Sequence, residues 1–422
     1  MQHNAFPAGV TREGLLDWYR RLRQRTQSLF AIPSDDAWYD RPIPLRNPIV
    51  FYEGHLPAFA VNTLVKLAHR REGVDRELEV LFARGIDPED ATALRDPSTA
   101  WPSRERVKAF VEACDALVED ALRNAPLSDE RVPALRGGEA VFTILEHEAM
   151  HQETLAYLLH ALPHEKKRRG PFMDVPRVRL AQTAAPVRIP AGRVTLGQSR
   201  ASYGWDNEFP ATVVDVDAFA IDSFSVTNGE YLEYVEATGA APPHFWLRGE
   251  REWYWRGMFE PSPLDPEAPV YVTHDEAARF AKWKNKRLPS EAEFHRAAFG
   301  TPDGEERALP WGDSLPDASR GNFDFRSFDP VPVGSYPAGA SAWGVHDLIG
   351  NGWEWTSTLF SGFDGFVPMP SYQQYSVDFF DGAHYVLKGA SPVTPHELIR
   401  RSFRNWFRPS YPYVFARFRC VA

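Results

Sequence analysis

The sequence predicts an α+β protein of two domains, a helical N-terminal bundle and a C-terminal half rich in loops. Apolar residues recur at helical spacing over positions 14–164. After Val187 they give way to short strand-like pieces between glycine, proline, aspartate and asparagine turns. A chain of 422 residues has room for two or three domains of about 150 residues each. We therefore expect a bundle over 1–169, a linker over 170–186 and a second domain over 187–422.

The bundle is predicted from four apolar patterns that repeat with the period of an α-helix. Four such helices joined by loops are typical of a four-helix bundle. The charged run HEKKRR at 164–169 is expected to be the solvated end of the last helix. The linker follows, because 170–186 contains three prolines and shows no periodicity. The predicted helices cover 14–30, 47–71, 103–123 and 138–164.

The second half is predicted to combine short strands with two helices and much irregular structure. Strand-like pieces lie at 187–189 and 213–216, and a helix is expected over 273–284. A further helix begins near Ser290, where Glu293 three residues later completes a capping-box pattern.

Composition excludes several classes of protein. The net charge of −10 makes nucleic acid an unlikely main partner, because proteins that bind phosphate backbones carry a basic excess. No apolar run reaches the roughly 20 residues that span a bilayer. The first residues have no secretion signal, so we expect a cytoplasmic protein. Only Cys114 and Cys420 are present, which excludes a disulfide scaffold or a thiolate metal site. Composition does not predict the oligomeric state.

The clearest chemistry lies in the fourth predicted helix, at HEAMHQE over 147–153. His147 and His151 are four residues apart and so share one helix face. The same face carries Ile144, Leu155 and Leu158, which indicates that both imidazoles point into the core. Buried polar groups need partners. The pair is therefore either a metal site or two hydrogen-bonded core histidines.

Three kinds of metal site remain open at this point. HEAMH matches the zinc-peptidase pattern, with Glu148 as general base, although Thr154 and Tyr157 replace the glycine and histidine of its extended form. A di-metal carboxylate bundle needs a second Glu-x-x-His, which the chain lacks. A mononuclear site needs a third histidine from another helix. His55 is the best candidate, since Pro57 suits a first helical turn and would place His55 near a helix end beside a cleft.

Five segments of the second half are distinctive: VRIPAG at 187–192, FSVTN at 224–228, KRLPSEAEF at 286–294, GVHDLIGNGWEWT at 344–356 and RFRC at 417–420. Together they resemble the formylglycine-generating-enzyme (sulfatase-modifying factor) fold, which is C-type-lectin-like, and the resemblance spans 187–422. That family uses a pair of cysteines, and only Cys420 lies here, so its own activity is not expected. A non-catalytic binding module of this fold is an alternative.

The two halves together resemble the ergothioneine-biosynthetic sulfoxide synthases, which couple a DinB-like bundle to this second fold. Their H-x-x-x-H-x-E iron motif matches His147, His151 and Glu153, and an earlier histidine matches His55. The resemblance implies that the three histidines bind Fe²⁺. Glu153 turns away from the histidine face, so we expect it to support the site without binding the metal.

The resemblance also implies the reaction. With O₂ as co-substrate, a sulfur or selenium atom is joined to imidazole C2 of hercynine (trimethylhistidine) and oxidised to the sulfoxide or selenoxide. In the Tyr-x-x-Tyr-Ser segment, Tyr372 matches the catalytic tyrosine, which delivers a proton or electron, and Tyr375 a hercynine contact. Asn405 and Trp406 suit the trimethylammonium group, because an aromatic face holds a cation without hydrogen bonds.

Two departures from the family pattern lie among the expected substrate contacts. Phe407 stands where the family has an aspartate that pairs with the amino-acid end of a thiol substrate, and Met150 replaces a common glutamine. An apolar ring cannot pair with an ammonium group. The departures favour the selenoneine synthase branch, whose second substrate is a selenosugar. A sulfoxide synthase using cysteine or γ-glutamylcysteine is the alternative.

Overall fold

The computed structural model describes residues 9–83, 100–169 and 185–422, and the predicted α+β class is confirmed. The chain forms two compact units, each treated separately below. Unit 1 takes its described residues from Met1–Gly170 together with Arg200–Trp205 and Pro368–Tyr375. Unit 2 takes its described residues from Pro171–Ser199, Asp206–Val367 and Ser376–Ala422. Most of the expected linker, at 170–184, and the first eight residues lie outside the described part.

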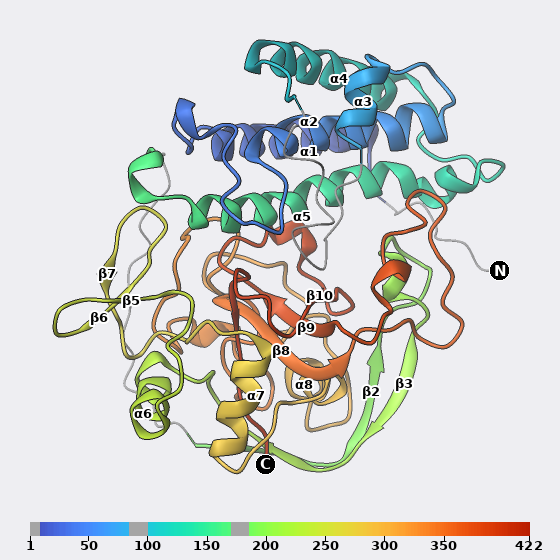
Figure 1. The fold of residues 1–422 in the computed structure, drawn as a ribbon. Coiled ribbons are helices and arrows are strands. Elements are labelled where there is room, and N and C mark those ends of the chain that lie inside the picture. The colour runs from blue at the N-terminus through green and yellow to red at the C-terminus, as the bar shows by residue number, and fades with distance from the viewer. Residues whose placement is uncertain (1–8, 84–99, 170–184) are drawn as a thin grey trace. The chain divides into compact units, whose positions relative to one another are not determined.

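Unit 1 is a helical bundle (Figure 1) in which each of the four predicted helices is present. Side-chain caps mark two helix starts: Thr11 accepts a hydrogen bond from the Gly14 amide, and Ser103 accepts one from the Arg106 amide. The helices are α1 (Arg12–Phe30), α2 (Ile49–Ala60), a π-helix (Val61–Ala68), α3 (Arg76–Leu81), α4 (Arg104–Asn124) and α5 (Glu139–Ala161). Short 3₁₀ turns cover Asp35–Ala37, Pro133–Gly138 and His164–Lys166.

The second helix differs from the prediction around Pro57. α2 begins at Ile49, so His55 lies in the middle of the helix rather than at its start, and Pro57 is inside it. The run from Ile49 to Tyr52 is buried, and this burial stabilises the turns before the proline. Past Ala60 the helix widens into the π-helix, in which the His69 amide donates to the Leu64 carbonyl five residues back.

α5 is buried on all sides rather than along one stripe. Ala149, Gln152 and Ala156 lie off the histidine face and are as buried as Leu155 and Leu158 on it. α5 packs against both α1 and α2, and this explains why its polar side chains are enclosed as well. The helix ends at Ala161, before the charged run expected to be its end. Within that run, Lys166 Nζ pairs with the Asp40 carboxylate at 2.5 Å.

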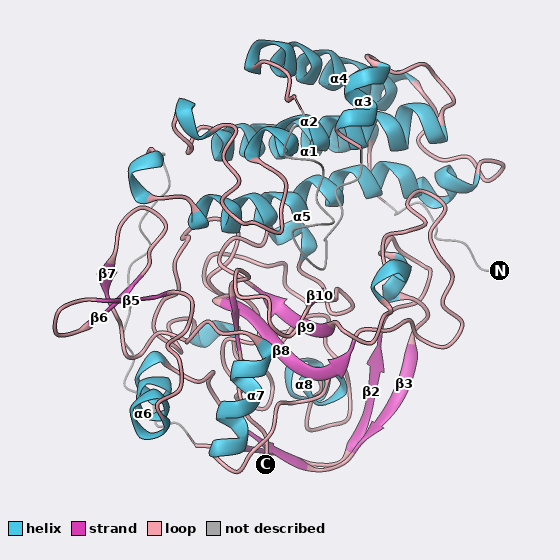
Figure 2. Cartoon of the chain, viewed as in Figure 1, coloured by secondary structure: helices cyan, strands magenta, loops and turns pink. Residues whose placement is uncertain are grey.

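Unit 2 contains little regular structure between its loops (Figure 2). Its largest sheet has the strand order β10-β9-β8-β11, antiparallel except for the parallel pair β8 and β11. These strands are β8 (Gly352–Leu359), β9 (Tyr385–Ala390), β10 (Asn405–Phe407) and β11 (Ala416–Arg417). The smaller sheets comprise β1 (Val187–Ile189), β2 (Gly192–Leu196), β3 (Thr212–Val216), β4 (Phe219–Ile221), β5 (Trp246–Arg248), β6 (Trp253–Trp255) and β7 (Ser262–Pro263).

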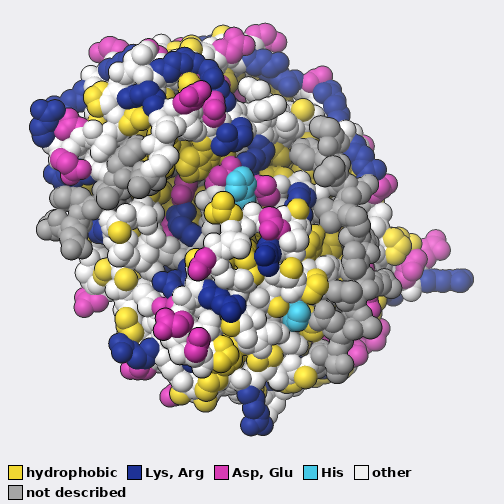
Figure 3. All heavy atoms as spheres, turned by 180° about the vertical axis from the view of Figure 1, so that it is seen from behind, with side chains coloured by type: hydrophobic (Ala, Val, Ile, Leu, Met, Phe, Trp, Pro, Cys, Tyr) yellow, Lys and Arg dark blue, Asp and Glu magenta, His cyan; other side chains and the backbone are white. Residues whose placement is uncertain are grey.

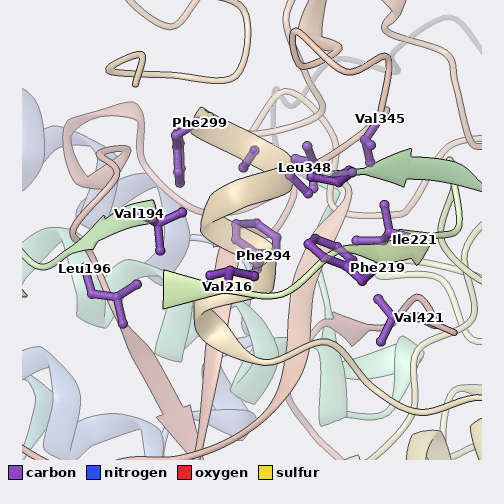
Figure 4. Close-up of a cluster of buried hydrophobic side chains, with 13 residues drawn as sticks. Val194, Leu196, Val216, Phe219, Ile221, Phe294, Phe299, Val345, Leu348 and Val421 are labelled. Carbon is purple, nitrogen blue, oxygen red and sulfur yellow. The ribbon is translucent and has the colours of Figure 1, made fainter. Parts of the chain in front are cut away.

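Three helices complete unit 2, and each starts with a capping box. The predicted pair of Ser290 and Glu293 is confirmed, and equivalent boxes cap the other two helices. The last of the three carries Phe294 and Phe299 into a core with residues from β1 to β4 and from the chain end (Figure 4). The helices are α6 (Asn228–Thr238), α7 (His274–Trp283) and α8 (Glu291–Phe299).

The terminal RFRC string has a structural role. Arg417 and Arg419 are fully buried, and Arg419 Nε lies 2.6 Å from the buried Glu354 carboxylate. Cys420 is buried as well.

Across the described ranges, none of the helices is both long and apolar enough to cross a membrane. On the face drawn in Figure 3, Lys and Arg side chains are mixed with Asp and Glu.

Candidate metal centre

Three histidines of unit 1 converge on one point. α2 supplies His55, and α5 supplies His147 and His151 from adjacent turns of one face. One ligand atom of each imidazole lies within 4.8 Å of the others. The ring centroids are 5.2 Å apart for His55 and His147, 4.9 Å for His55 and His151, and 4.4 Å for His147 and His151. The structure thus brings together the ligand set proposed from the sequence.

The surroundings of these rings favour neutral imidazoles. Burial lowers the pKa of His147 and of His151 well below the usual range, the neighbouring histidines lower both pKa values further, and Arg46 adds to the effect on His151. His55 Nδ1 lies 3.0 Å from the Phe82 carbonyl oxygen, which can only accept, so Nδ1 carries the proton and Nε2 keeps its lone pair. His151 Nδ1 is buried and has no hydrogen-bond partner among the described residues.

Aromatic rings hold the imidazoles in place. Phe59 stacks on His147 with a centroid distance of 3.5 Å, and Phe51 stacks on His55 at 4.9 Å. Gly54 lets the Phe82 ring approach α2, since a Cβ at this position would lie 2.4 Å from that ring. Phe59 was missed in the sequence, although its spacing of four residues from His55 places it on the same helix face.

The donor set fits a mononuclear divalent metal. Three neutral imidazoles leave coordination positions open for substrate or oxygen, as redox-active iron requires. The group of possible ligands found here contains no carboxylate, so the described residues do not support a di-metal carboxylate site. The other such group in the described part of the chain, Asp324, His396 and Glu397, lies in unit 2.

Glu148 is not available as the general base of a zinc peptidase. Its Oε1 accepts hydrogen bonds from Arg23 Nη1 at 2.8 Å and Thr26 Oγ1 at 2.5 Å, and all three side chains are buried. Gln152, one turn on, donates to Thr26 Oγ1 at 3.0 Å. The pair Glu148 and Gln152 therefore faces α1, whereas His147 and His151 face α2.

The Pro368–Tyr375 segment of unit 1 carries both expected tyrosines to the histidines. The Tyr372 ring lies 6.3 Å from the His147 ring and 5.1 Å from the Phe59 ring. Tyr375 lies 5.7 Å from Tyr372, and its hydroxyl donates to Met150 Sδ at 3.2 Å. The predicted residues Tyr372, Tyr375 and Met150 thus gather around the histidine site.

Hydrogen bonds to α5 fix the Pro368–Tyr375 segment and also the Arg200–Trp205 segment. The Ser371 amide donates to the Glu139 carboxylate at 2.8 Å. Trp205 stacks on Tyr375 at 4.0 Å, and its indole N–H donates to Glu146 Oε2 at 2.8 Å. Nothing in the sequence singled out Trp205, because it is distant along the chain from α5 and from Tyr375.

The other three expected substrate contacts lie on β10 in unit 2. Trp406 stacks on Phe360 with a centroid distance of 4.2 Å, and Asn405 Oδ1 accepts a hydrogen bond from the Trp406 amide at 2.9 Å. Phe407 stacks on Tyr411 at 5.3 Å. Asn405, Trp406 and Phe407 are all partly exposed, so each keeps surface for a ligand.

Comparison with known proteins finds relatives along the whole chain. The family model described as "Sulfatase-modifying factor enzyme 1-like domain" matches residues 171–422, and that described as "DinB superfamily" matches 19–155. A protein named "Hercynine oxygenase" from Mycolicibacterium thermoresistibile is 32% identical, over 94% of this chain and 92% of the relative.

Two further relatives agree with the first. A "Hercynine oxygenase" from Mycolicibacterium smegmatis is 31% identical over 97% of this chain and 99% of its own. An "Ergothioneine biosynthesis protein 1" from Schizosaccharomyces pombe is 27% identical over 92% of this chain and 53% of its own. Both bacterial relatives therefore match this chain along nearly their full length.

Proposed function

The chain belongs to the hercynine oxygenase family, the ergothioneine sulfoxide synthases, and from this membership we propose that it joins a chalcogen atom to the imidazole of hercynine in an O₂-dependent, iron-requiring reaction. The observation that carries the proposal is the convergence of three neutral imidazoles from two bundle helices. His55, His147 and His151 would hold the metal. When bound, ferrous iron supplies the one-electron chemistry that lets O₂ react.

The residues around the histidines take distinct roles in this proposal. The Tyr372 ring lies 6.3 Å from that of His147. Its phenol oxygen carries the proton that the oxygen chemistry consumes. Tyr375 and Met150 form one wall for hercynine, with Trp205 behind Tyr375. For Asn405 and Trp406 of β10 the proposal rests on the family motif alone, in which an amide dipole and a ring face suit a trimethylammonium group.

For the chalcogen donor we propose a selenosugar. The Phe407 ring stacks on Tyr411, so this position presents aromatic surface and no charge to an ammonium group. A donor such as cysteine or γ-glutamylcysteine carries an ammonium group. This group would lose its water here without gaining a carboxylate partner, which costs free energy.

We place the reaction in the cytoplasm, since both cysteines are free thiols.

An aerobic assay with ferrous iron and hercynine tests the proposal. A selenosugar, cysteine and γ-glutamylcysteine are offered in parallel, and products are identified by mass. We expect the His151→Ala variant to lose both bound iron and turnover. His69→Ala is the matched control, because the His69 ring bonds to the Pro126 carbonyl away from the site. Tyr372→Phe should keep its iron and lose about 10²-fold or more in turnover.

Three results would contradict the proposal. The first is full iron content and turnover in His151→Ala. The second is copurification with zinc and peptidase activity that is lost in Glu148→Gln. The third is the absence of metal uptake and of O₂ consumption in the presence of hercynine, which a non-enzymatic binding module would show.

A further inference from the structure

A row of oxidisable rings leads away from the histidine site within unit 1. The Tyr372 ring lies 6.3 Å from the ring of His147, and the Tyr375 ring lies 5.7 Å from that of Tyr372. Trp205 stacks on Tyr375 at 4.0 Å, and the Tyr203 ring lies 6.1 Å from Trp205. Electron transfer slows steeply with distance, and these short steps place each ring next to the following one. We call Tyr372, Tyr375, Trp205 and Tyr203 the aromatic row.

The hydrogen bond of Trp205 makes its indole the ring of the row that best holds a positive charge. Its N–H donates to Glu146 Oε2 at 2.8 Å, and Trp205 and Glu146 are only 1% and 4% exposed. An oxygen that faces the indole nitrogen stabilises the charge formed when the ring loses an electron, and does so more strongly where water is excluded. The Tyr375 hydroxyl instead donates to Met150 Sδ, a weak acceptor. The charge therefore belongs on Trp205, and Tyr375 is the bridge to Tyr372.

Tyr203 is the outer end of the row. Its side chain is 8% exposed, and the two residues before it, Ala201 and Ser202, are exposed. Its hydroxyl lies 3.3 Å from Thr143 Oγ1. Tyr203 also contacts Phe142 at 5.3 Å, but a phenyl ring without a hydroxyl is much harder to oxidise. An oxidising equivalent that reaches Tyr203 thus stays there, close to solvent.

We propose that the aromatic row carries oxidising equivalents away from the metal site when O₂ reacts without a chalcogen donor, and so protects the site from its own oxidant. The inference rests on the proposed function and adds a protective one-electron route to it. Without a donor atom to oxidise, the electrons that O₂ takes up come from the protein. Met150 would be an early target of this damage, because a thioether is readily oxidised to the sulfoxide.

The steps of this route balance in electrons and protons. Oxygen chemistry at the site removes a hydrogen atom from the Tyr372 phenol. Trp205 gives one electron through the Tyr375 ring to the Tyr372 radical, which takes a proton from water and becomes a phenol again. Tyr203 then returns an electron to Trp205 and releases its phenol proton to water.

An external thiol restores the outer end of the row. A low-molecular-weight thiol gives a hydrogen atom to the Tyr203 radical, and two of the resulting thiyl radicals combine to a disulfide. In total, O₂ oxidises the thiol, and all the rings of the row return to their starting state.

Rapid-freeze electron paramagnetic resonance tests the proposal on the iron-loaded full chain, mixed with O₂ and hercynine but no chalcogen donor. We expect an organic radical whose spectrum changes when the protein contains ring-deuterated tryptophan, which identifies an indole. Trp205→Phe should abolish this signal, because a phenyl ring can stack on Tyr375 but resists oxidation. Trp38→Phe is the matched control and should keep the signal, since Trp38 is equally buried and packs on Phe30, outside the row.

Oxidative damage gives a second readout. After equal O₂ consumption, peptide mass spectrometry should find severalfold more oxidised Met150 in Trp205→Phe than in the wild type. Tyr203→Phe should keep its turnover with a donor, because Tyr203 is outside the residues proposed to hold metal or substrate. In this variant glutathione should no longer quench the indole radical rapidly. Tyr39→Phe, which removes an exposed hydroxyl bonded to the Pro102 carbonyl, should behave as the wild type.

Iron content and product formation with a donor are measured on the same proteins, so that the two ideas can fail separately. An indole radical that survives in Trp205→Phe, equal oxidation of Met150 in both proteins, or equal quenching in Tyr203→Phe overturns the protective route while the proposed function stands. The absence of a protein radical, or of O₂ consumption without a donor, overturns the route as well. If iron does not bind through the three histidines, the proposed function fails too, and the iron analysis shows it.

Discussion

Arg23 of α1 donates to the Glu148 carboxylate of α5 at 2.8 Å, and both side chains are buried next to the histidine pair. Arg23 Nε also lies 2.9 Å from Asp115 on α4, which in turn accepts from the Tyr19 hydroxyl at 2.6 Å. Three helices are joined by this one set of polar contacts. These contacts fix the rotation of α5 about its axis, and therefore the direction in which His147 and His151 point.

The first prediction concerns Glu148. Glu148→Gln should keep bound iron and most turnover, since the carboxylate faces α1 and not the metal site. The variant should lose about 2 kcal/mol of unfolding free energy, because a charge-assisted hydrogen bond to a buried guanidinium is weakened. Urea unfolding and iron analysis measure the two effects. Glu77→Gln, in an exposed pair with Arg106, should change stability by less than about 1 kcal/mol. Loss of iron from Glu148→Gln would contradict the interpretation.

The second prediction concerns the buried arginines at the chain end. Arg419→Met removes one partner of the fully buried Glu354 and should destabilise the protein by about 3–5 kcal/mol. Arg193→Met is the comparison, since that side chain is exposed and lies 4.0 Å from Asp215. Denaturant unfolding monitored by tryptophan fluorescence gives both values. Equal stability of the two variants would show that the burial of Glu354 carries no such cost.

The third prediction concerns the two thiols. Burial raises the pKa of the Cys420 thiol to about 12, and burial raises that of Cys114 still further. Neither thiol should react quickly with a disulfide reagent at pH 8 in the folded protein, whereas both should react after denaturation. A thiol that reacts rapidly in the folded state would contradict the burial seen here.

The same two thiols should make the unfolding free energy depend on pH. From about pH 9 to 12 the folded protein keeps the Cys420 proton while the unfolded chain releases it. Their contribution to the unfolding free energy should therefore fall as the pH rises through this window. Cys420→Ala should flatten this part of the profile, measured by urea unfolding at a series of pH values.

The fourth prediction concerns Phe407. Phe407→Asp adds a carboxylate on β10, where it can pair with an ammonium group. We expect turnover with γ-glutamylcysteine relative to the selenosugar to rise at least tenfold, as a new charge-assisted hydrogen bond implies. Phe407→Leu keeps the site apolar and should not cause this change. If the ratio of turnover with the two donors is unchanged in Phe407→Asp, this position does not determine which donor is used.

Much of the fold could be predicted from the chain alone because it depends on local rules. The 3-4 spacing of apolar residues predicted the four bundle helices, and the serine and glutamate pair at 290 and 293 predicted the start of α8. The spacing of His147 and His151 required that they share a face wherever the helix lay. The position of His55 within its helix was predicted wrongly, because the local preference of Pro57 was outweighed by burial of the residues before it.

The sequence by itself determined the helices, the histidine pair and the motifs of both halves, since each depends on residues close together along the chain. Only the tertiary structure decided that His55 meets that pair and that Tyr372 and Tyr375 lie beside it. It alone showed that Glu148 is held by Arg23 and that Trp205 supports Tyr375. These contacts join residues more than 90 positions apart along the chain. Packing of the whole unit selects such contacts, and no local periodicity of the sequence encodes them.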